Sequence, residues 1–358
     1  MKKRVISMFL CGVLAVSMLA GCGSEKTKDT NANAGSADTT EAAEETETPE
    51  ETETPETASG DEQNGDITIG SVIMNTSGEW FAEVIAGQEA AAADLGVKIS
   101  IVSSDNEVSK ESDNVATFVS QQVDALCISP LSADASVAAI EAAKEAQIPV
   151  VNWNTTVNTD TDGFVGVSNY ELGSNTGKYV KEYIEENYPD GCKMAIISNS
   201  NYEIGVERCT GFEDTVKDIE GLEIVTKQDA ELQEEGMDIT EQILTAHPDV
   251  QLIWAWNQTS LLGCVAALQN KGNADIVVMG TDMSMELAKD MQGDSVKLQA
   301  ITTQMPYDIG YQAVENAVKA AKGESIDTET IIPVKTYTKE NQDEITTYIE
   351  EHQDLIQQ

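Results

Sequence analysis

From residue 67 onward, short runs rich in β-branched residues alternate with longer amphipathic stretches, at a spacing of roughly 25 to 30 residues. This alternation is typical of βαβ units and predicts an α/β fold built on parallel sheets. The predicted strands span residues 67–73, 97–102, 125–129, 149–153, 163–167, 193–198, 222–226, 252–256, 276–280 and 298–302.

Helical spacing of apolar residues fills the intervals between these strands. In the stretch 79–95, Phe81, Val84 and Ile85 recur at helical spacing and Gly96 follows as a stop, and His247 is expected to end another helix. The remaining predicted helices span residues 109–121, 133–146, 172–186, 206–217, 237–246, 260–271, 285–291 and 307–322. So many elements over about 270 residues exceed one ordinary sheet, which predicts two doubly wound lobes. Since no long linker separates them, the chain is expected to cross between the lobes more than once.

The chain begins with a basic start, Lys2 to Arg4, followed by an apolar stretch and the small pair Ala20-Gly21 before Cys22. The apolar stretch contains polar residues and is shorter than the roughly 20 residues that a membrane span needs. The segment resembles the lipobox of bacterial lipoproteins. That resemblance implies that residues 1–21 are a signal peptide, and that Cys22 carries the lipid tying a soluble body to a membrane face.

Residues 22–66 contain almost no large apolar side chain and are dense in Glu, Thr, Asp, Asn and Ala. Such a composition cannot bury enough apolar surface to offset the entropy of the chain, so we predict a disordered tether. Its like charges repel one another and extend it, which would hold a folded body away from the lipid headgroups.

The chain carries 63 acidic against 21 basic residues and a formal net charge of -42. This balance excludes nucleic acid as a partner and disfavours adsorption to anionic lipid, because both depend on clustered Lys and Arg. The histidines, His247 and His352, are isolated and no cysteine pair has metal-ligand spacing, so neither a metal nor a cofactor is expected. Beyond the leader and the lipid site, four cysteines remain, which are expected to be buried thiols, with a disulfide among them left open: Cys127, Cys192, Cys209 and Cys264.

Polar and aromatic side chains follow several predicted strands, where ligands gather in open α/β sheets. The candidate ligand-binding residues are Trp80, Phe81, Asn154, Arg208, Asn257, Asp282 and Gln304. This mixture suits a polyhydroxylated ligand, because hydroxyls hydrogen-bond to carboxylates, amides and arginine while the apolar faces of a sugar ring pack on aromatic rings.

Taken together, residues 67 to about 334 resemble the periplasmic binding proteins of the ribose and galactose type. The segments that carry the resemblance are 87–96, 208–212, 245–250, 280–282 and 304–306. It implies the type I fold of that family, with one lobe from residues 67–168 plus 305–332 and another from 169–304 plus 333–340. A three-crossing hinge is expected near residues 168–169, 305–306 and 332–333. Residues 341–358 are expected to form an acidic helical tail exposed to solvent.

In functional terms, the resemblance implies that the protein is the sugar-binding component of an ATP-driven (ABC) importer. It would lie outside the cytoplasm, anchored by lipid to the cell membrane, and on the periplasmic face of that membrane if the source has an outer membrane. The implied partners are a small neutral sugar and a membrane permease, and the protein is expected to be a monomer. Trp80 and Phe81 would stack on the sugar ring. Hydrogen bonds would come from Arg208, Asn257, Asp282 and Gln304, and from Asn154, which stands where the family often has an aspartate.

The sequence departs from the ribose type at Asn154-Thr155, where that type usually has Asp-Arg. The resemblance therefore does not identify ribose as the ligand. Several candidates also have purely structural interpretations. In the structural interpretation of Arg208, it forms a surface ion pair with Glu207 or Glu213 and does not contact a ligand. In the structural interpretation of Asp282, it only caps the helix that begins near residue 284. The tryptophans with a core interpretation are Trp153, Trp254 and Trp256.

An enzyme is not expected, because the chain contains no G-x-S-x-G, P-loop or G-x-G-x-x-G motif. A transcription regulator with a similar two-lobed body would begin with a basic helix-turn-helix, which the leader and the acidic tether replace. The alternative that stays open is a receptor that senses a sugar or autoinducer-2 and signals to a chemoreceptor or a histidine kinase.

Overall fold

Two six-stranded sheets organise the computed structural model, which describes residues 67–273 and 275–353. The first sheet has the order β11-β5-β4-β3-β1-β2, and every neighbouring pair is parallel. Its strands are β1 Thr68–Ile73, β2 Lys98–Ser103, β3 Ala125–Ile128, β4 Val150–Trp153, β5 Gly163–Gly166 and β11 Glu329–Ile331. We call this sheet with its helices the first lobe.

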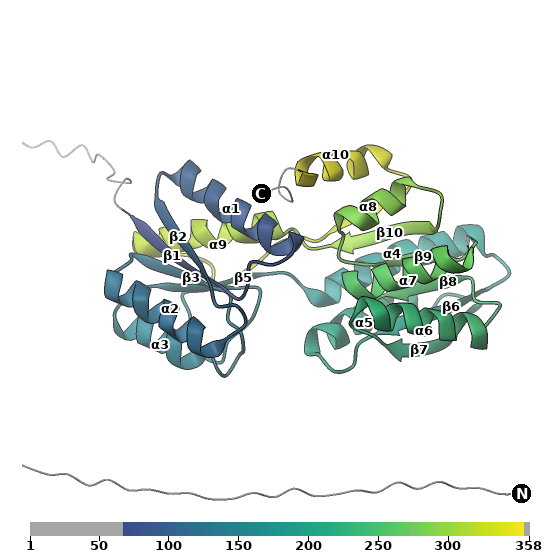
Figure 1. The fold of residues 1–358 in the computed structure, drawn as a ribbon, viewed down its shortest axis with the longest axis horizontal. Coiled ribbons are helices and arrows are strands. Elements are labelled where there is room, and N and C mark those ends of the chain that lie inside the picture. Colours follow the sequence, from purple (N-terminus) through teal and green to yellow (C-terminus); the bar gives the residue numbers. More distant parts are fainter. Residues whose placement is uncertain (1–66, 274, 354–358) are drawn as a thin grey trace, which may run out of the picture. The chain divides into compact units, whose positions relative to one another are not determined.

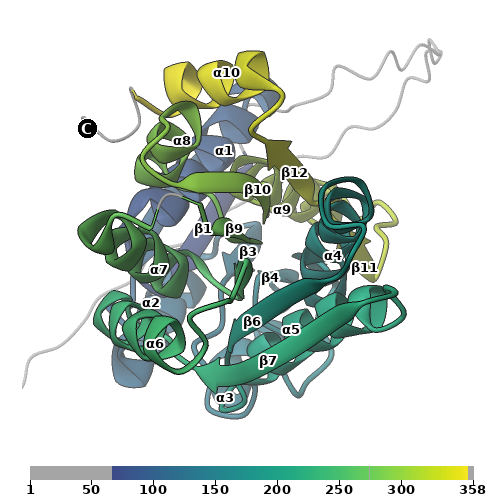
Figure 2. The same ribbon diagram turned by 90° about the vertical axis from the view of Figure 1, so that its right-hand side faces the viewer.

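The second sheet has the order β12-β10-β9-β8-β6-β7 and is parallel except for β12, which runs antiparallel to β10 (Figure 2). Its strands are β6 Cys192–Ser198, β7 Leu222–Asp229, β8 Leu252–Ala255, β9 Val277–Thr281, β10 Lys297–Thr303 and β12 Lys335–Thr338. This sheet with its helices is the second lobe. The predicted α/β fold with two parallel-sheet lobes is confirmed.

Helices cover both faces of each sheet (Figure 1). In the first lobe, α1 and α9 cover one face and α2 and α3 the other. In the second lobe, α4 and α5 cover one face, and α6, α7, α8 and α10 cover the other. The helices are α1 Glu79–Leu95, α2 Val108–Gln121, α3 Val137–Glu145, α4 Asn169–Asn187, α5 Glu203–Val216, α6 Gln233–Ala246, α7 Gln258–Lys271, α8 Met285–Gln292, α9 Pro306–Ala321 and α10 Gln342–Gln353.

Local sequence signals account for many of these boundaries. Gly96 ends α1 in the left-handed conformation, at φ 66°, and His247 ends α6, both as predicted. Ser168 begins α4, where its side chain accepts a hydrogen bond from the backbone N–H of Glu171. The fully buried Trp153 and Trp254 belong to the cores, as their core interpretation predicted.

The chain passes between the two sheets at three places. It leaves the first sheet after β5 and enters α4, returns after β10 through α9, and leaves again between β11 and β12. These passages coincide with the residues at which the hinge was expected, and their action as a hinge stays a prediction.

The C-terminal region differs from its prediction. Strands β11 and β12 were not predicted, because they are three and four residues long and carry little hydrophobic pattern. Helix α10 is present, but a solvent-exposed tail is wrong, since Ile345 is 0% and Tyr348 5% exposed in the core of the second lobe. An amphipathic face therefore binds this acidic helix to the body.

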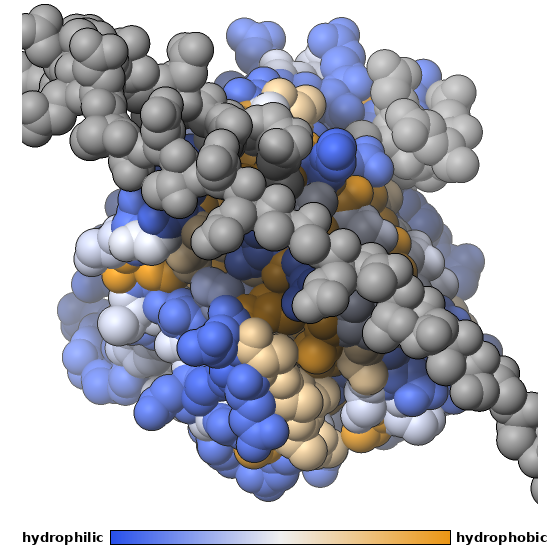
Figure 3. Space-filling view, turned by 90° about the vertical axis from the view of Figure 1, so that its left-hand side faces the viewer, coloured by the Kyte–Doolittle hydropathy of each residue, from blue (hydrophilic) through white to orange (hydrophobic). Residues whose placement is uncertain are grey.

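Cys127, Cys192, Cys209 and Cys264 are buried free thiols, so the structure forms no disulfide among these four. Within residues 67–273 and 275–353, no helix combines the length and the apolar character required to cross a bilayer. On the face shown in Figure 3, hydrophilic residues dominate the rim and hydrophobic residues gather near the centre. The signal peptide, Cys22 and the tether lie outside the described residues.

Candidate functional site

Three predicted site residues meet around the carboxylate of Asp282. This residue follows β9 at the carboxyl end of the second sheet, in the left-handed conformation at φ 66°. Its Oδ2 lies 2.5 Å from Nη1 of Arg208, and its Oδ1 accepts a hydrogen bond of 3.2 Å from Nε2 of Gln304. The side chains come from α5, the end of β9 and the end of β10, so the fold joins three separate segments.

Arg208 is buried, with 4% of the residue exposed, yet its donors are well supplied with partners. Its Nε donates to Oδ1 of Asn169 at 3.0 Å, and Nη1 also donates to the carbonyl oxygen of Trp256 at 3.3 Å. The guanidinium lies 5.7 Å from the centroid of the Trp256 ring. A buried charge needs such compensation, because an unpaired one costs several kcal/mol.

These contacts decide between the interpretations left open by the sequence. Arg208 pairs with Asp282, so the surface ion pair with Glu207 or Glu213 is wrong. Ser284, whose side chain accepts from the backbone N–H of Leu287 at 3.2 Å, caps α8 instead of Asp282.

Close packing of α4 against α5 fixes the backbone that carries Arg208. A Cβ atom added at Gly173 would lie 1.8 Å from the carbonyl oxygen of Arg208, and one added at Gly211 would lie 2.0 Å from that of Tyr170. The two helices therefore touch backbone to backbone, which only glycine permits. This contact fixes how closely the α5 backbone at Arg208 approaches α4.

Trp80 and Phe81 begin α1 in the first lobe, but they have different surroundings. Their rings meet edge to face at 5.0 Å between centroids, and Trp80 also stacks on the buried Trp153 at 6.3 Å. Trp80 lines a small cavity together with Asp282 and Gln304. Phe81, like Trp80, packs against the core of the first lobe, but it does not line either of the two cavities described below.

Neither Asn154 nor Asn257 bonds to the Asp282 carboxylate or lines either of the two cavities described below. Asn154 is exposed at φ 64° after β4. Asn257 begins α7, where its Oδ1 accepts from the backbone N–H of Ser260 at 2.9 Å and its Nδ2 donates to the carbonyl oxygen of Glu231 at 3.2 Å. Its side chain is thus occupied as a helix cap, a role that the sequence analysis did not assign to it.

Two cavities lie where α1 faces the second lobe. The smaller, about 20 Å³, is lined by side chains from both lobes, among them Trp80, Glu83, Asp282 and Gln304. The larger, about 570 Å³, shares Glu79 and Gln258 with it and extends along α8. Ligand pockets usually measure about 300–1,000 Å³, so the smaller cavity has to widen before a monosaccharide can reach Asp282.

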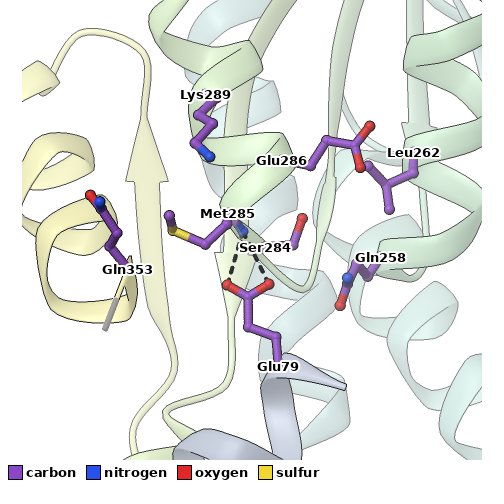
Figure 4. Close-up of a pocket in the computed structure, with 8 residues that line it drawn as sticks. All are labelled: Glu79, Gln258, Leu262, Ser284, Met285, Glu286, Lys289 and Gln353. Atoms are coloured by element: carbon purple, nitrogen blue, oxygen red, sulfur yellow. Dashed lines mark hydrogen bonds between the residues drawn. The ribbon is translucent and has the colours of Figure 1, made fainter. Parts of the chain in front are cut away.

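Glu79 connects the two lobes at these cavities, and the sequence analysis missed it. Figure 4 shows its carboxylate pointing from the start of α1 toward the start of α8, where both oxygens accept from the backbone N–H of Met285, at 3.0 and 3.2 Å. Burial raises the pKa of Glu79, although this hydrogen bond opposes the shift. The only sequence signal for Glu79 and Gln258, which line both cavities, was their position beside predicted site residues. Glu79 directly precedes Trp80, and Gln258 directly follows Asn257.

Among the described residues, no group of three or more His, Cys, Asp or Glu side chains is arranged to hold a metal ion. The polar network around Asp282 instead consists of side chains that bind by hydrogen bonds. The expectation that no cofactor is required stays a prediction.

Comparison with known proteins identifies the family. A sequence profile described as a periplasmic binding protein domain matches residues 69–325. The chain belongs to the periplasmic binding protein family. This finding agrees with the resemblance stated above.

Two curated relatives match most of the chain. The ABC transporter periplasmic-binding protein YphF of Escherichia coli (strain K12) is 30% identical over 292 residues, covering 76% of this chain and 86% of that protein. The ribose import binding protein RbsB of Salmonella typhimurium (strain LT2) is 30% identical over 276 residues, covering 76% and 91%.

Solved structures share the fold of this binding protein. A periplasmic ribose ABC transporter structure from Conexibacter woesei has a TM-score of 0.70 at 24% identity, covering 79% of this chain and 95% of that one. A periplasmic solute binding protein from Actinobacillus succinogenes with bound D-allose has a TM-score of 0.68 at 22% identity, covering 78% and 99%.

Proposed function

We propose that this protein is an extracytoplasmic solute-binding lipoprotein that captures a small neutral sugar between its lobes and delivers it to an ABC-type importer. The observation that carries the proposal is the position of Asp282. Its carboxylate, held by Arg208 and Gln304, lines the same cavity as the ring of Trp80 from the other lobe.

The chemistry of this site suits a polyol. A carboxylate offers about four lone-pair positions, so Asp282 can accept from sugar hydroxyls while it keeps its two present partners. The charge of Asp282 is compensated by Arg208, which favours an uncharged ligand. Trp80 supplies an aromatic surface for the apolar face of a sugar ring.

The relatives support the same class of ligand. One is a ribose import binding protein at 30% identity, and structures with the same fold contain D-allose or myo-inositol. Binding to residues on both lobes would shift the protein toward a closed arrangement, which a membrane permease would recognise. Nothing in this cycle requires a catalytic step.

Membrane attachment through Cys22 is part of the proposal and rests on the leader sequence. Substitution Cys22→Ser is expected to move the protein from the membrane fraction to the soluble fraction of cells. Retention of the variant in the membrane would count against the lipid anchor.

A thermal-shift screen of the full chain tests the ligand class, with pentoses, hexoses, polyols, autoinducer-2, amino acids and peptides. A sugar at 100 times its dissociation constant is expected to add about 2.7 kcal/mol to the free energy of unfolding. Stabilisation only by amino acids or peptides would overturn the proposal.

A further inference from the structure

Helix α10 belongs to the second lobe by its packing. Ile345 is 0% and Tyr348 5% exposed in the core of that lobe, and the Tyr348 ring meets Tyr337 of β12 edge to face at 5.4 Å. The helix lies beside α8 (Figure 2). Its last turn is therefore held in a defined place.

That last turn also contacts α1 of the first lobe. Nε2 of His352 lies 3.1 Å from Oε2 of Glu83, a residue that is only 5% exposed. Nδ1 of His352 lies 2.6 Å from the carbonyl oxygen of Tyr348. A carbonyl and a carboxylate both only accept, so both ring nitrogens donate when His352 carries a positive charge.

Glu79, one helical turn before Glu83, makes the second contact between α1 and the second lobe. Residues four apart share one face of a helix. Glu79 accepts from the first N–H of α8, where the helix dipole favours a negative charge, while Glu83 pairs with α10. Glu79, Glu83 and Tyr348 also line the small cavity around Asp282.

We propose that Glu79 and Glu83 of α1 form a latch with the start of α8 and with His352 of α10, which holds the lobes together around the small cavity before any sugar binds. The latch is a wall of that cavity, so its release widens the access to Asp282. It acts by protein–protein contacts alone and does not depend on the identity of the ligand.

The latch is expected to loosen as pH rises. The titratable groups that act on His352 are Glu79 and Glu83 of α1, and its ring stacks on Tyr348 of α10. Farther out, Tyr337 of β12 meets Tyr348, and Lys289 of α8 faces Glu79. Burial lowers the pKa of His352, but the bond to Glu83 and the neighbouring carboxylates outweigh burial and leave this pKa above the ordinary 6.5.

The contact between charged His352 and Glu83 stabilises the latch fully below pH 6.5, where His352 is protonated. This contribution to stability is lost as pH rises through the raised pKa of His352. Burial also raises the pKa of Glu79, so ionisation of this carboxyl is disfavoured in the folded protein. The hydrogen bond from Met285 opposes this shift and itself favours the ionised carboxylate, so the loosening of the latch at higher pH comes from His352.

An NMR titration of the imidazole signals of the full chain tests the charge on His352. The chain has 2 histidines, so the His352 signals are assigned as those lost in His352→Gln. We expect a pKa above 6.5 that falls in Glu83→Gln and is unchanged in Glu89→Gln, the same substitution at an exposed position of α1. A pKa at or below 6.5, or equal effects of the two variants, would overturn the proposal.

Amide hydrogen exchange of ligand-free protein tests whether the two contacts act as one device. At pH 6, removal of the charged contact by His352→Gln or by Glu83→Gln is expected to speed exchange of the Met285 amide about 10- to 150-fold. Glu89→Gln should leave that rate unchanged. Unchanged Met285 exchange in folded His352→Gln and Glu83→Gln variants would show separate local contacts and no latch. Since no sugar is present, this result is independent of the sugar screen.

Discussion

The two lobes present different kinds of side chain to the cavities between them. In the second lobe, Asp282 is bonded to Arg208 and Gln304, and Arg208 in turn to Asn169, all within the same lobe. In the first lobe, Glu79 finds its backbone partner on the other lobe. The indole N–H of Trp80 is buried with no hydrogen-bond partner among the described residues.

This difference has a structural origin. The network around Asp282 draws on several strand ends and on α4 and α5, so each polar group has local partners. The first lobe offers mainly the start of α1, where Gly78 provides no side-chain cap. We infer that the second lobe is preorganised for binding, whereas the groups of the first lobe are satisfied only when the second lobe or a ligand meets them.

The largest expected loss of stability comes from a substitution in the Asp282 network of the second lobe. Asp282→Asn leaves the charge of Arg208 buried without its carboxylate, so the free energy of unfolding should fall by about 3–5 kcal/mol in urea titrations. Asp249→Asn makes the same change in the exposed pair with Lys193 and should cost less than about 1 kcal/mol. Equal costs would show that the Arg208–Asp282 pair is no more than a surface contact.

The close helix contacts of both lobes are expected to be equally intolerant of an added Cβ atom. Gly173→Ala places a Cβ against the backbone of Arg208, and Gly87→Ala places one 2.0 Å from the carbonyl oxygen of Tyr307. Each should lower the free energy of unfolding by about 1–3 kcal/mol in thermal melts. Gly293→Ala, with its nearest contact at 3.6 Å and φ -83°, should change it by less than about 0.5 kcal/mol. A tolerated Gly87→Ala would mean that the first lobe is more loosely packed.

The aromatic pair tests what the first lobe adds to binding. Trp80→Ala should weaken the sugar found in the screen by about 10-fold in calorimetric titrations, because this ring lines the cavity. Phe81→Ala removes a ring that packs in the core, so it should lower stability and leave affinity nearly unchanged. The reverse order would place Phe81 at the ligand.

The smallest expected effect is at Asn257. Asn257→Ala removes the cap of α7 and should cost about 1 kcal/mol of stability, while Asn257→Asp keeps a capping oxygen and should restore most of it. Thermal melts of the three proteins give the comparison. A large loss of sugar affinity in Asn257→Asp, with stability intact, would assign Asn257 to the ligand instead.

Much of the fold and part of the site could be predicted from local sequence. Apolar periodicity located the long strands and helices, but it failed for β11 and β12, because these strands are only three and four residues long and carry little hydrophobic pattern. Position after strands selected Asp282, Gln304 and Trp80, which the structure brings to one cavity and whose ligand contacts stay a prediction. The same argument selected Asn154, which is exposed and does not line the small cavity.

The sequence by itself determined the alternation of strands and helices and the polar residues at strand ends, because these follow from hydrophobic periodicity and from the direction of parallel strands. Tertiary structure alone decided that Arg208 pairs with Asp282, that Asn257 caps a helix and that Glu83 meets His352. The physical reason is that a charged side chain takes whichever partner packing brings within a few ångströms, and residues 269 positions apart carry no local signal of that meeting.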